Sequence, residues 1–289
     1  MTCKRYMHNT VFLNGEWLAA EAAKVSVYDR GFLFADGIYE VVPVYQRRPF
    51  LINAHLARMQ RSLAALNISA PAADYWQTVI NELLARNDLA DALVYIQITR
   101  GAEKNRSHLP SGSMQATLFA SLSPLKVHWH QPQPTAVTLL DDIRWLRCEI
   151  KSISLLGNIM LKQQAHQAGF SEPLLQRDGY ITEGASCNFF GVRDGVIYTA
   201  PKSHLILSGI TREHVIHLAR ELNLELREEA FAVADLAQLD ELFLTSSSRE
   251  VQPIDRIDAM IVGNGQCGPI TAQLVAAYHA SKRKLCEIS

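Results

Sequence analysis

A proline-rich stretch near the middle of the chain is the feature that most constrains its fold. The segment SPLKVHWHQPQPTAV, residues 123–137, holds three prolines and shows no helical or strand periodicity. Such segments are typical of linkers, because proline lacks a backbone donor and interrupts regular structure. A chain of 289 residues also exceeds the usual size of one domain. We therefore predict an N-terminal α/β domain over residues 1–125, a linker over 126–134 and a C-terminal α/β domain over 135–289.

Hydrophobic periodicity predicts that both domains mix strands and helices, so the expected fold class is α+β. The elements expected in the N-terminal domain are a hairpin turning at Asn14-Gly15, strands over 38–44 and 94–99, and helices over 55–66, capped by Asn53, and over 75–86. Those expected in the C-terminal domain are a helix over 155–168, hairpins turning at Asp178-Gly179 and Asp194-Gly195, a helix from Thr211, a strand over 241–245 and a helix from Ile270.

The composition argues against several classes of partner. The formal net charge is -1, with 20% charged and 48% hydrophobic residues, which lacks the charge surplus of nucleic-acid or acidic-membrane binders. No apolar run approaches the length of a membrane span. The five cysteines are scattered and form no CxxC pair, so neither a zinc site nor a redox motif is expected. We expect a cytoplasmic protein with reduced thiols that acts on small molecules and binds no metal, nucleic acid or membrane.

One lysine stands directly before an apolar helical pattern. Lys151 lies in EIKSISLLGN, and a lysine amine can form an imine with the carbonyl of pyridoxal phosphate. A lysine taken alone is more often a solvated surface charge. The assignment therefore depends on three further groups that this cofactor needs: an anion cradle, a carboxylate for the pyridine nitrogen and a group that orients the substrate.

Two segments offer an anion cradle. In SGITREH, Gly209, Ile210 and Thr211 stand at a predicted helix start, where unpaired N–H groups and the helix dipole attract phosphate. Thr211 is alternatively a simple helix cap. In TSSSRE, Ser246 and Ser247 follow a predicted strand and can donate their hydroxyls, or they form only a turn.

Two further segments offer the carboxylate and the orienting group. Glu183, in YITEGASCNFF, can pair with a protonated pyridine nitrogen, or it is a structural carboxylate. Arg106 and His108, in NRSHLP, are two residues apart, so in extended backbone they point the same way and can hold a substrate carboxylate together. The alternative for this pair is a polar loop.

Seven segments carry a resemblance to a known family. They are DRGFLFADGIYEV, HLARM, TRGAEKNRSH, DIRWLRCEIKSISLLGN, ITEGASCNFFG, LILSGITR and ELFLTSSSREV, in this order from residue 29 to 251. With them the sequence resembles the fold-type IV pyridoxal-phosphate enzymes, and within these the D-amino-acid (D-alanine) aminotransferases. The resemblance implies a two-domain α+β fold with pyridoxal 5'-phosphate between the domains and the Schiff-base lysine in the C-terminal one.

The resemblance also implies a role for each site residue. Lys151 would be the Schiff-base lysine and proton shuttle, and Glu183 the partner of the pyridine nitrogen. The remaining implied cofactor contacts are Arg58, Ile210, Thr211 and Ser247 at the phosphate, with Ser246 beside them, and Leu207 on the ring. Tyr39, Arg106 and His108 would trap the substrate carboxylate, the arginine and histidine reaching in from the neighbouring subunit. A homodimer with shared active sites is therefore expected.

The activity implied is the transfer of the amino group of D-alanine or similar D-amino acids to 2-oxoglutarate by a ping-pong mechanism. Branched-chain L-amino-acid aminotransferases share the fold, but the pair Arg106 and His108 speaks against them. An aminodeoxychorismate lyase would use the same lysine to release pyruvate, and the matches around Arg106 and Trp145 favour transamination instead. In a protein that merely binds the cofactor or a partner, the proton shuttle and the carboxylate trap would have no purpose.

Three positions depart from the family pattern. Ala35 stands where FGDG would place glycine, and Ala185 replaces a serine after the Glu-Gly pair. Pro43 occupies a strand position that is basic in some relatives, and proline there predicts an edge strand or a bulge.

Overall fold

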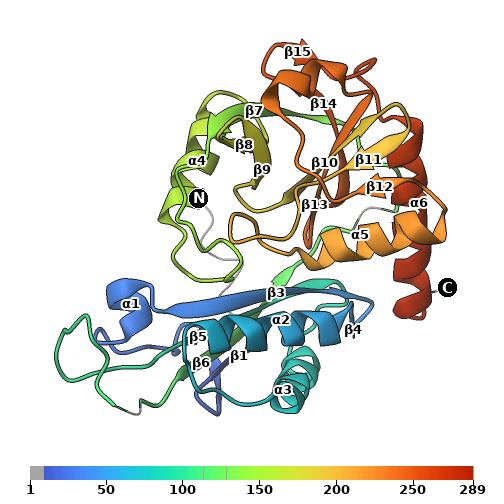
Figure 1. The fold of residues 1–289 in the computed structure, drawn as a ribbon. Coiled ribbons are helices and arrows are strands. Elements are labelled where there is room, and N and C mark those ends of the chain that lie inside the picture. Colours follow the sequence, from blue (N-terminus) through green and yellow to red (C-terminus); the bar gives the residue numbers. More distant parts are fainter. Residues whose placement is uncertain (1–9, 113, 128, 289) are drawn as a thin grey trace. The chain divides into compact units, whose positions relative to one another are not determined.

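The computed structural model describes residues 10–112, 114–127 and 129–288 (Figure 1). Backbone contacts divide the chain into two compact units, Met1–Val127 with Ile150–Ser154, and His128–Glu149 with Leu155–Ser289. The division at residue 127 falls inside the stretch expected as a linker. The short segment that carries Lys151 groups with the first unit, whereas we expected it within the C-terminal domain.

The first unit is built on a six-stranded antiparallel sheet with the order β2-β1-β6-β5-β3-β4. Its strands are β1 (Thr10–Leu13), β2 (Glu16–Ala19), β3 (Gly37–Tyr45), β4 (Arg48–Pro49), β5 (Ala92–Thr99) and β6 (Thr117–Pro124), and its helices are α1 (Arg30–Phe34), α2 (Ile52–Ala65) and α3 (Ala73–Ala85). The hairpin expected at Asn14-Gly15 joins β1 to β2, and both turn residues have the positive φ that the turn requires, 51° and 94°.

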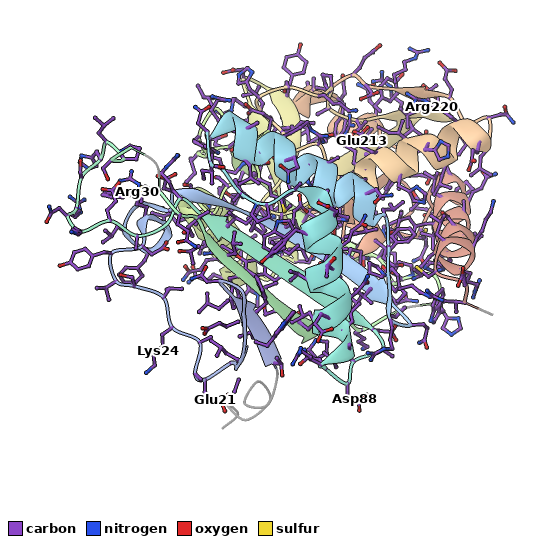
Figure 2. The ribbon with its side chains drawn as sticks, turned by 90° about the horizontal axis from the view of Figure 1, so that it is seen from below. Glu21, Lys24, Arg30, Asp88, Glu213 and Arg220 are labelled. Carbon is purple, nitrogen blue, oxygen red and sulfur yellow. The ribbon has the colours of Figure 1, made fainter. Side chains whose placement is uncertain are left out.

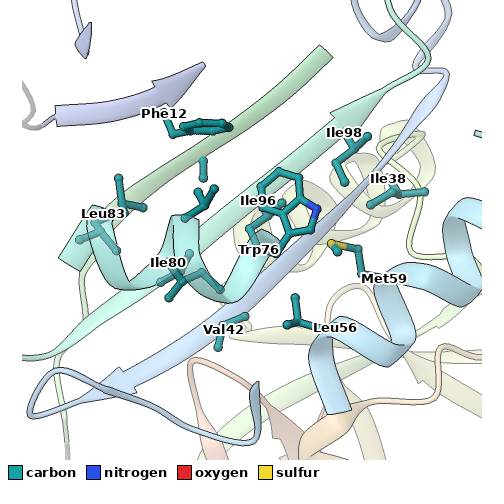
Figure 3. Packing of buried hydrophobic residues seen from close by; sticks show 14 of the residues in the cluster. Phe12, Ile38, Val42, Leu56, Met59, Trp76, Ile80, Leu83, Ile96 and Ile98 are labelled. Atoms are coloured by element: carbon teal, nitrogen blue, oxygen red, sulfur yellow. The ribbon is translucent and has the colours of Figure 1, made fainter. Parts of the chain in front are cut away.

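Helices α2 and α3 cover one face of this sheet and enclose its core (Figure 1). Figure 3 shows Leu56 and Met59 of α2 and Trp76 of α3 packed beside Ile38 and Val42 of β3. The helix residues recur at the spacing of one helical face and the strand residues at alternate positions, which is why the periodicity predicted both elements.

The start of α2 differs from the expectation. The helix begins at Ile52 after Leu51, so Asn53 is not its cap. The Asn53 side chain instead accepts a hydrogen bond from Gln77 Nε2 of α3 at 2.9 Å. A tertiary contact therefore uses the amide that local capping preference had assigned to the helix end.

Pro43 lies in an unbroken stretch of β3. Residues 37–44 pair with β5 in one constant register, so there is no bulge. Phe50 N donates to Pro43 O at 2.8 Å on the side of β4, the two-residue edge strand. In an antiparallel strand the N–H and C=O of one residue point to the same side. The missing N–H of Pro43 thus faces the outer side of β3, away from β5, which explains why proline is tolerated.

The second unit is built on a nine-stranded mixed sheet with the order β12-β11-β10-β13-β14-β7-β8-β9, and β15 pairs with β14. Its strands are β7 (Thr135–Asp141), β8 (Glu172–Arg177), β9 (Tyr180–Gly184), β10 (Asn188–Arg193), β11 (Val196–Tyr198), β12 (Leu226–Arg227), β13 (Glu241–Ser246), β14 (Glu250–Ile257) and β15 (Met260–Ile261). Its helices are α4 (Leu156–Gln167), α5 (Ile210–Glu221) and α6 (Pro269–Leu285), with a short 3-10 helix over Val233–Gln238.

The local signals in this unit are confirmed. Asp178-Gly179 and Asp194-Gly195 turn the β8–β9 and β10–β11 hairpins, and all four residues have positive φ. Helices α4, α5 and α6 begin within one residue of the expected positions. Among the helices that the described residues form, none has the length and apolar character needed to cross a membrane.

Candidate active site

Lys151 is held along the outer edge of β3 by its own backbone. Tyr39 N donates to Lys151 O at 3.0 Å, and Lys151 N donates to Ser62 Oγ of α2 at 3.2 Å. Ile153 N donates to Gly37 O at 3.0 Å, so the segment runs beside the first half of the strand. A hydrogen bond on each side of one residue fixes where its side chain leaves the backbone.

The Lys151 amine lies against Tyr39. Its Nζ is 4.1 Å from the centroid of the Tyr39 ring, a cation–π distance. Tyr39 also packs against Tyr95, with 5.9 Å between the ring centroids, and burial raises the pKa of Tyr95 to about 12. Two residues singled out from separate motifs, Lys151 and Tyr39, are therefore in contact.

Arg58 belongs to a buried charged cluster that the sequence analysis did not identify. Its Nε and Nη2 donate to the two carboxylate oxygens of Glu40 at 2.7 and 2.8 Å, and His55 Nδ1 is 2.9 Å from Glu40 Oε2. Burial opposes ionisation of Glu40, but the Arg58 guanidinium beside it holds its pKa well below the usual range. Glu40 shares the helix-covered face of β3 with Ile38 and Val42, which is the signal that could have revealed it.

Arg106 and His108 lie on an exposed segment without regular structure. Both side chains contact Phe34 of α1: the Arg106 guanidinium carbon is 4.9 Å and the His108 ring centroid 5.4 Å from the centre of its ring. The pair is thus brought together, as expected from the spacing. Among the described residues the two side chains contact Phe34 and form no hydrogen bond with Tyr39.

Glu183 is the centre of a buried network in the second unit. Its Oε1 accepts from Arg144 Nη1 at 2.6 Å, and its Oε2 accepts from Asn188 Nδ2 at 2.9 Å. The Leu207 N–H donates to both oxygens, at 3.1 and 3.0 Å. Burial raises the pKa of Glu183 to about 7, and the Arg144 guanidinium opposes this rise. The hydrogen bonds fix the position of the carboxylate. A further cation beside it would lower its pKa and favour its charged form.

Arg144 is the positive charge of this network and was missed from the sequence. Its Nε and Nη2 donate to the two oxygens of Asp142 at 2.9 and 2.8 Å. Burial opposes ionisation of Asp142, yet Arg144 holds the pKa of that carboxyl below its usual value. Both residues lie in the segment DIRWLRCEIKSISLLGN, so an acidic and a basic residue two apart in a family motif were the available signal.

Helix α5 presents backbone N–H groups at its N-terminus. Gly209 is its N-cap, Ile210 its first residue and buried Thr211 its second, and the N-cap residue, being glycine, makes no side-chain capping hydrogen bond. The alternative in which Thr211 is the cap is therefore excluded. A Cβ on Gly209 would lie 2.2 Å from Asn188 Oδ1, so a larger residue would displace the Asn188 side chain, whose Nδ2 donates to Glu183 and to Leu207 O. Uncapped N–H groups at a helix start attract anions.

The serines at the end of β13 lie next to an unpaired buried hydroxyl. Ser246 Oγ accepts from Arg249 N at 3.1 Å, which forms the turn that serine clusters often make, and Ser247 lies within that turn. Thr245 is 1% exposed, and its hydroxyl has no partner among the described residues. Thr245 stands directly opposite Asn188 in the β10–β13 register, so the two side chains share a face.

Comparisons with known proteins show which family the chain resembles. The sequence model of the family described as amino-transferase class IV matches residues 37–257. The D-alanine aminotransferase of Listeria monocytogenes serotype 1/2a (strain 10403S) is 36% identical over 269 residues, which cover 91% of this chain and 93% of that protein. The D-alanine aminotransferase of Bacillus licheniformis is 37% identical over 273 residues, which cover 94% of this chain and 96% of that protein.

Solved structures show the same fold. The branched-chain amino acid aminotransferase of Escherichia coli superposes with a TM-score of 0.87 at 25% identity, covering 92% of this chain and 92% of that one. The branched-chain aminotransferase of Thermoproteus uzoniensis with norvaline superposes with a TM-score of 0.88 at 25% identity, covering 97% of this chain and 96% of that one. The family match spans most of the chain, and the resemblance carried by the seven segments is confirmed. This chain belongs to the class IV aminotransferase family.

Proposed function

We propose that this aminotransferase uses pyridoxal 5'-phosphate to move the amino group of D-alanine, or of a similar D-amino acid, to 2-oxoglutarate by a ping-pong mechanism. The observation that carries the proposal is the contact between the Lys151 amine and the Tyr39 ring, because it joins the expected imine lysine to an expected substrate residue. Similarity to D-alanine aminotransferases over more than nine-tenths of the chain supports the choice of substrate.

The residues present fit the cofactor. The start of α5, where glycine is the N-cap and a Cβ on it would lie 2.2 Å from Asn188 Oδ1, offers backbone donors to a phosphate. The unpaired buried hydroxyl of Thr245 shares a face with Asn188 and directly precedes Ser246 and Ser247. We assign Arg58, Ile210, Thr211, Ser246 and Ser247 to the phosphate and Leu207 to the ring. Glu183, whose own pKa is raised, would be stabilised in its charged form by a pyridinium nitrogen.

Each of the chain's own groups then has a task. When bound, the cofactor supplies a reactive carbonyl and an electron sink. The Lys151 amine would hold the cofactor and would move a proton at the substrate α-carbon. Glu183 keeps a negative charge at the pyridine nitrogen, with Arg144, Asn188 and Leu207 fixing its position. Tyr39, together with the pair Arg106 and His108, binds the α-carboxylate and so decides which face of the substrate is presented to Lys151.

A homodimer with shared active sites is part of the proposal. Arg106 and His108 are exposed in the single chain and lie on a segment without regular structure. Side chains placed in this way are available to a second subunit. We assign them to the carboxylate of a substrate bound by the neighbouring chain, which makes one dimer the unit of activity.

The first test is spectroscopic. Purified enzyme is expected to show the visible absorbance of lysine-bound pyridoxal phosphate, and Lys151→Ala should abolish this band because the amine that binds the carbonyl is gone. Lys202→Ala, at an exposed lysine paired with Glu213, is the matched control and should keep the band. Retention of the band in Lys151→Ala would remove that lysine from its assigned role.

The second test concerns the substrate. With 2-oxoglutarate as acceptor, D-alanine should be converted to pyruvate much faster than L-leucine is converted to its keto acid. The fold is shared with branched-chain aminotransferases, so L-leucine is the relevant competitor. Transfer from L-leucine without transfer from D-alanine would reject the proposed substrate and retain the reaction class.

A further inference from the structure

The segment over residues 102–112, here called the carboxylate loop, has no strand or helix of its own to hold it. Its backbone joins the rest of the unit through an isolated bridge between Asp29 and Ala102 and through Glu103 N, which donates to Tyr28 O at 3.3 Å. Both contacts lie at the start of the loop. Arg106 and His108 come later, where exposed backbone would sample many conformations unless something fixed it.

Arg30 supplies that restraint. This arginine, the first residue of α1 (Figure 2), is 4% exposed. Its Nη1 donates to Ser107 O at 2.6 Å and its Nη2 donates to His108 O at 2.9 Å. The planar guanidinium therefore holds two consecutive carbonyls, which fixes the backbone around His108 more closely than a single hydrogen bond would.

Two acidic residues hold Arg30 itself. Its Nε donates to Asp36 Oδ2 at 2.8 Å, and its Nη1 is 3.5 Å from Glu103 Oε1. The same Glu103 oxygen accepts from Ser111 N at 2.9 Å, near the end of the loop. Asp36, which follows α1, thus fixes the guanidinium. The guanidinium contacts the middle of the loop directly at Ser107 and His108, and it is linked to Ser111 through Glu103.

Phe34, on the same short helix, completes the arrangement. The guanidinium carbons of Arg30 and Arg106 lie 4.8 and 4.9 Å from the centre of its ring, and the His108 ring centroid lies 5.4 Å away. Cations and rings at such distances attract one another. One aromatic side chain therefore contacts both Arg106 and His108, while Arg30 holds the carbonyls of Ser107 and His108.

We propose that Arg30 and Phe34 are positioning residues that set the direction of Arg106 and His108 and thereby determine how tightly the enzyme binds the α-carboxylate of its substrates. The inference rests on the proposed role of Arg106 and His108. A loop that is already ordered pays less conformational entropy when the substrate binds. Losing the restraint should therefore weaken carboxylate binding while the groups that carry out proton transfer stay intact.

The chain contains a matched control for Arg30. Arg100 donates from Nε to the same Asp36 Oδ2, also at 2.8 Å, and its Nη2 and Nη1 donate to Leu66 O and Asn67 O at 2.8 and 3.0 Å. Both arginines thus share one carboxylate and hold two consecutive carbonyls. They differ in the segment that they hold: Arg30 binds the carboxylate loop, whereas Arg100 binds the end of α2.

The experiment compares Arg30→Lys with Arg100→Lys in the holoenzyme. A lysine keeps the charge but cannot hold Asp36 and two carbonyls at once. Arg30→Lys should raise the KM for D-alanine and for 2-oxoglutarate roughly tenfold, the effect of about one lost ordering interaction, with kcat and the visible cofactor band little changed. Arg100→Lys should leave both KM values as in the wild type, even if it lowers the thermal stability as much as Arg30→Lys does.

Phe34→Leu is the second variant, and it decides the matter if Arg30→Lys does not fold. It should raise the same KM values severalfold, because the ring that both side chains contact is removed while an apolar side chain remains. The inference would be overturned if every folded variant of the two, Arg30→Lys and Phe34→Leu, kept the wild-type KM values. It would also be overturned if Arg100→Lys raised the KM values as much as Arg30→Lys.

Arg106→Ala separates the inference from the function on which it rests. A large rise in KM for this variant, with Arg30→Lys and Phe34→Leu unaffected, would leave the carboxylate role intact and reject only the positioning role. An unchanged KM in Arg106→Ala would reject the carboxylate role and the inference together. Elevated KM values in all three variants, and wild-type values in Arg100→Lys, are the expected result.

Discussion

Glu183 shows how one residue can be fully hydrogen-bonded and still be poorly stabilised as an anion. Donors from Arg144, Asn188 and Leu207 surround it, yet burial raises its pKa to about 7. Arg144 divides its charge, because it also binds both oxygens of Asp142. The positive charge of Arg144 thus does not fully offset the burial of Glu183, and the proposed pyridinium would add positive charge beside the carboxylate.

This predicts a pH dependence of stability in the cofactor-free enzyme. The pKa of Glu183 is raised from 4.5 to about 7 in the folded state, so the folded protein binds the extra proton between these values. The contribution of Glu183 to the free energy of unfolding is therefore fully present below pH 4.5 and is lost as the pH rises to about 7. Glu183→Gln should remove this loss.

The measurement is the urea midpoint of wild type and variant at several pH values. The difference between the two proteins isolates the Glu183 contribution from all other titrating groups. Glu82→Gln, at an exposed glutamate paired with Arg86, is the control for the change of charge and side-chain type. Parallel profiles for wild type and Glu183→Gln would contradict the assignment.

At the scale of elements, helix α1 ends on a residue poorly suited to its backbone. Ala35 is the C-cap with φ 54° and ψ 34°, the left-handed conformation that glycine adopts at no steric cost. The family pattern places glycine there, and the structure supplies the physical reason. Its N–H caps the helix by donating to Arg30 O and Gly31 O, so the strained conformation is retained.

Ala35→Gly should therefore stabilise the enzyme by about 1 kcal/mol, since an alanine in this conformation costs roughly that much. The free energy of unfolding from denaturant titration is the measurement. Ala57→Gly, at an exposed position inside α2, is the same substitution in a right-handed helix and should destabilise by about 1 kcal/mol. Equal signs for the two variants would refute the backbone argument.

At the scale of the whole molecule, the proposed shared sites predict complementation between two inactive chains. Lys151→Ala lacks the lysine, and Arg106→Ala lacks the carboxylate arginine. When the two are unfolded and refolded together, hybrid dimers would contain one site with both residues intact, because each comes from a different chain. Activity at low D-alanine concentration should reappear in the mixture. Either variant refolded alone should remain inactive under these conditions.

An absence of recovery would be decisive once native mass spectrometry shows that hybrid dimers have formed. It would mean that Arg106 serves the same chain as Lys151 or does not serve the site. If Arg30 also proves to position the loop that Arg106 occupies, recovery would place the effect of Arg30 at the site of the neighbouring chain.

The elements that the sequence predicted are those specified by neighbouring residues. Asn14-Gly15, Asp178-Gly179 and Asp194-Gly195 encode hairpins through positive φ, and the apolar spacing of α2 encodes a buried face. The misplaced cap at Asn53 marks the limit of such reasoning. Its amide serves a contact with Gln77, 24 residues away, which no local preference contains.

Residues close along the chain carry the periodicity, the turn chemistry and the order of the motifs. From these follow the mixed α+β class, most element positions, the family and the identity of the motif residues. Long-range packing instead places Lys151 along β3 beside Tyr39, Arg58 against Glu40 and Arg30 against the carboxylate loop. Arg30 and His108 are 78 residues apart in the chain. Contacts of that range depend on how sheets and helices pack, which a local pattern does not specify.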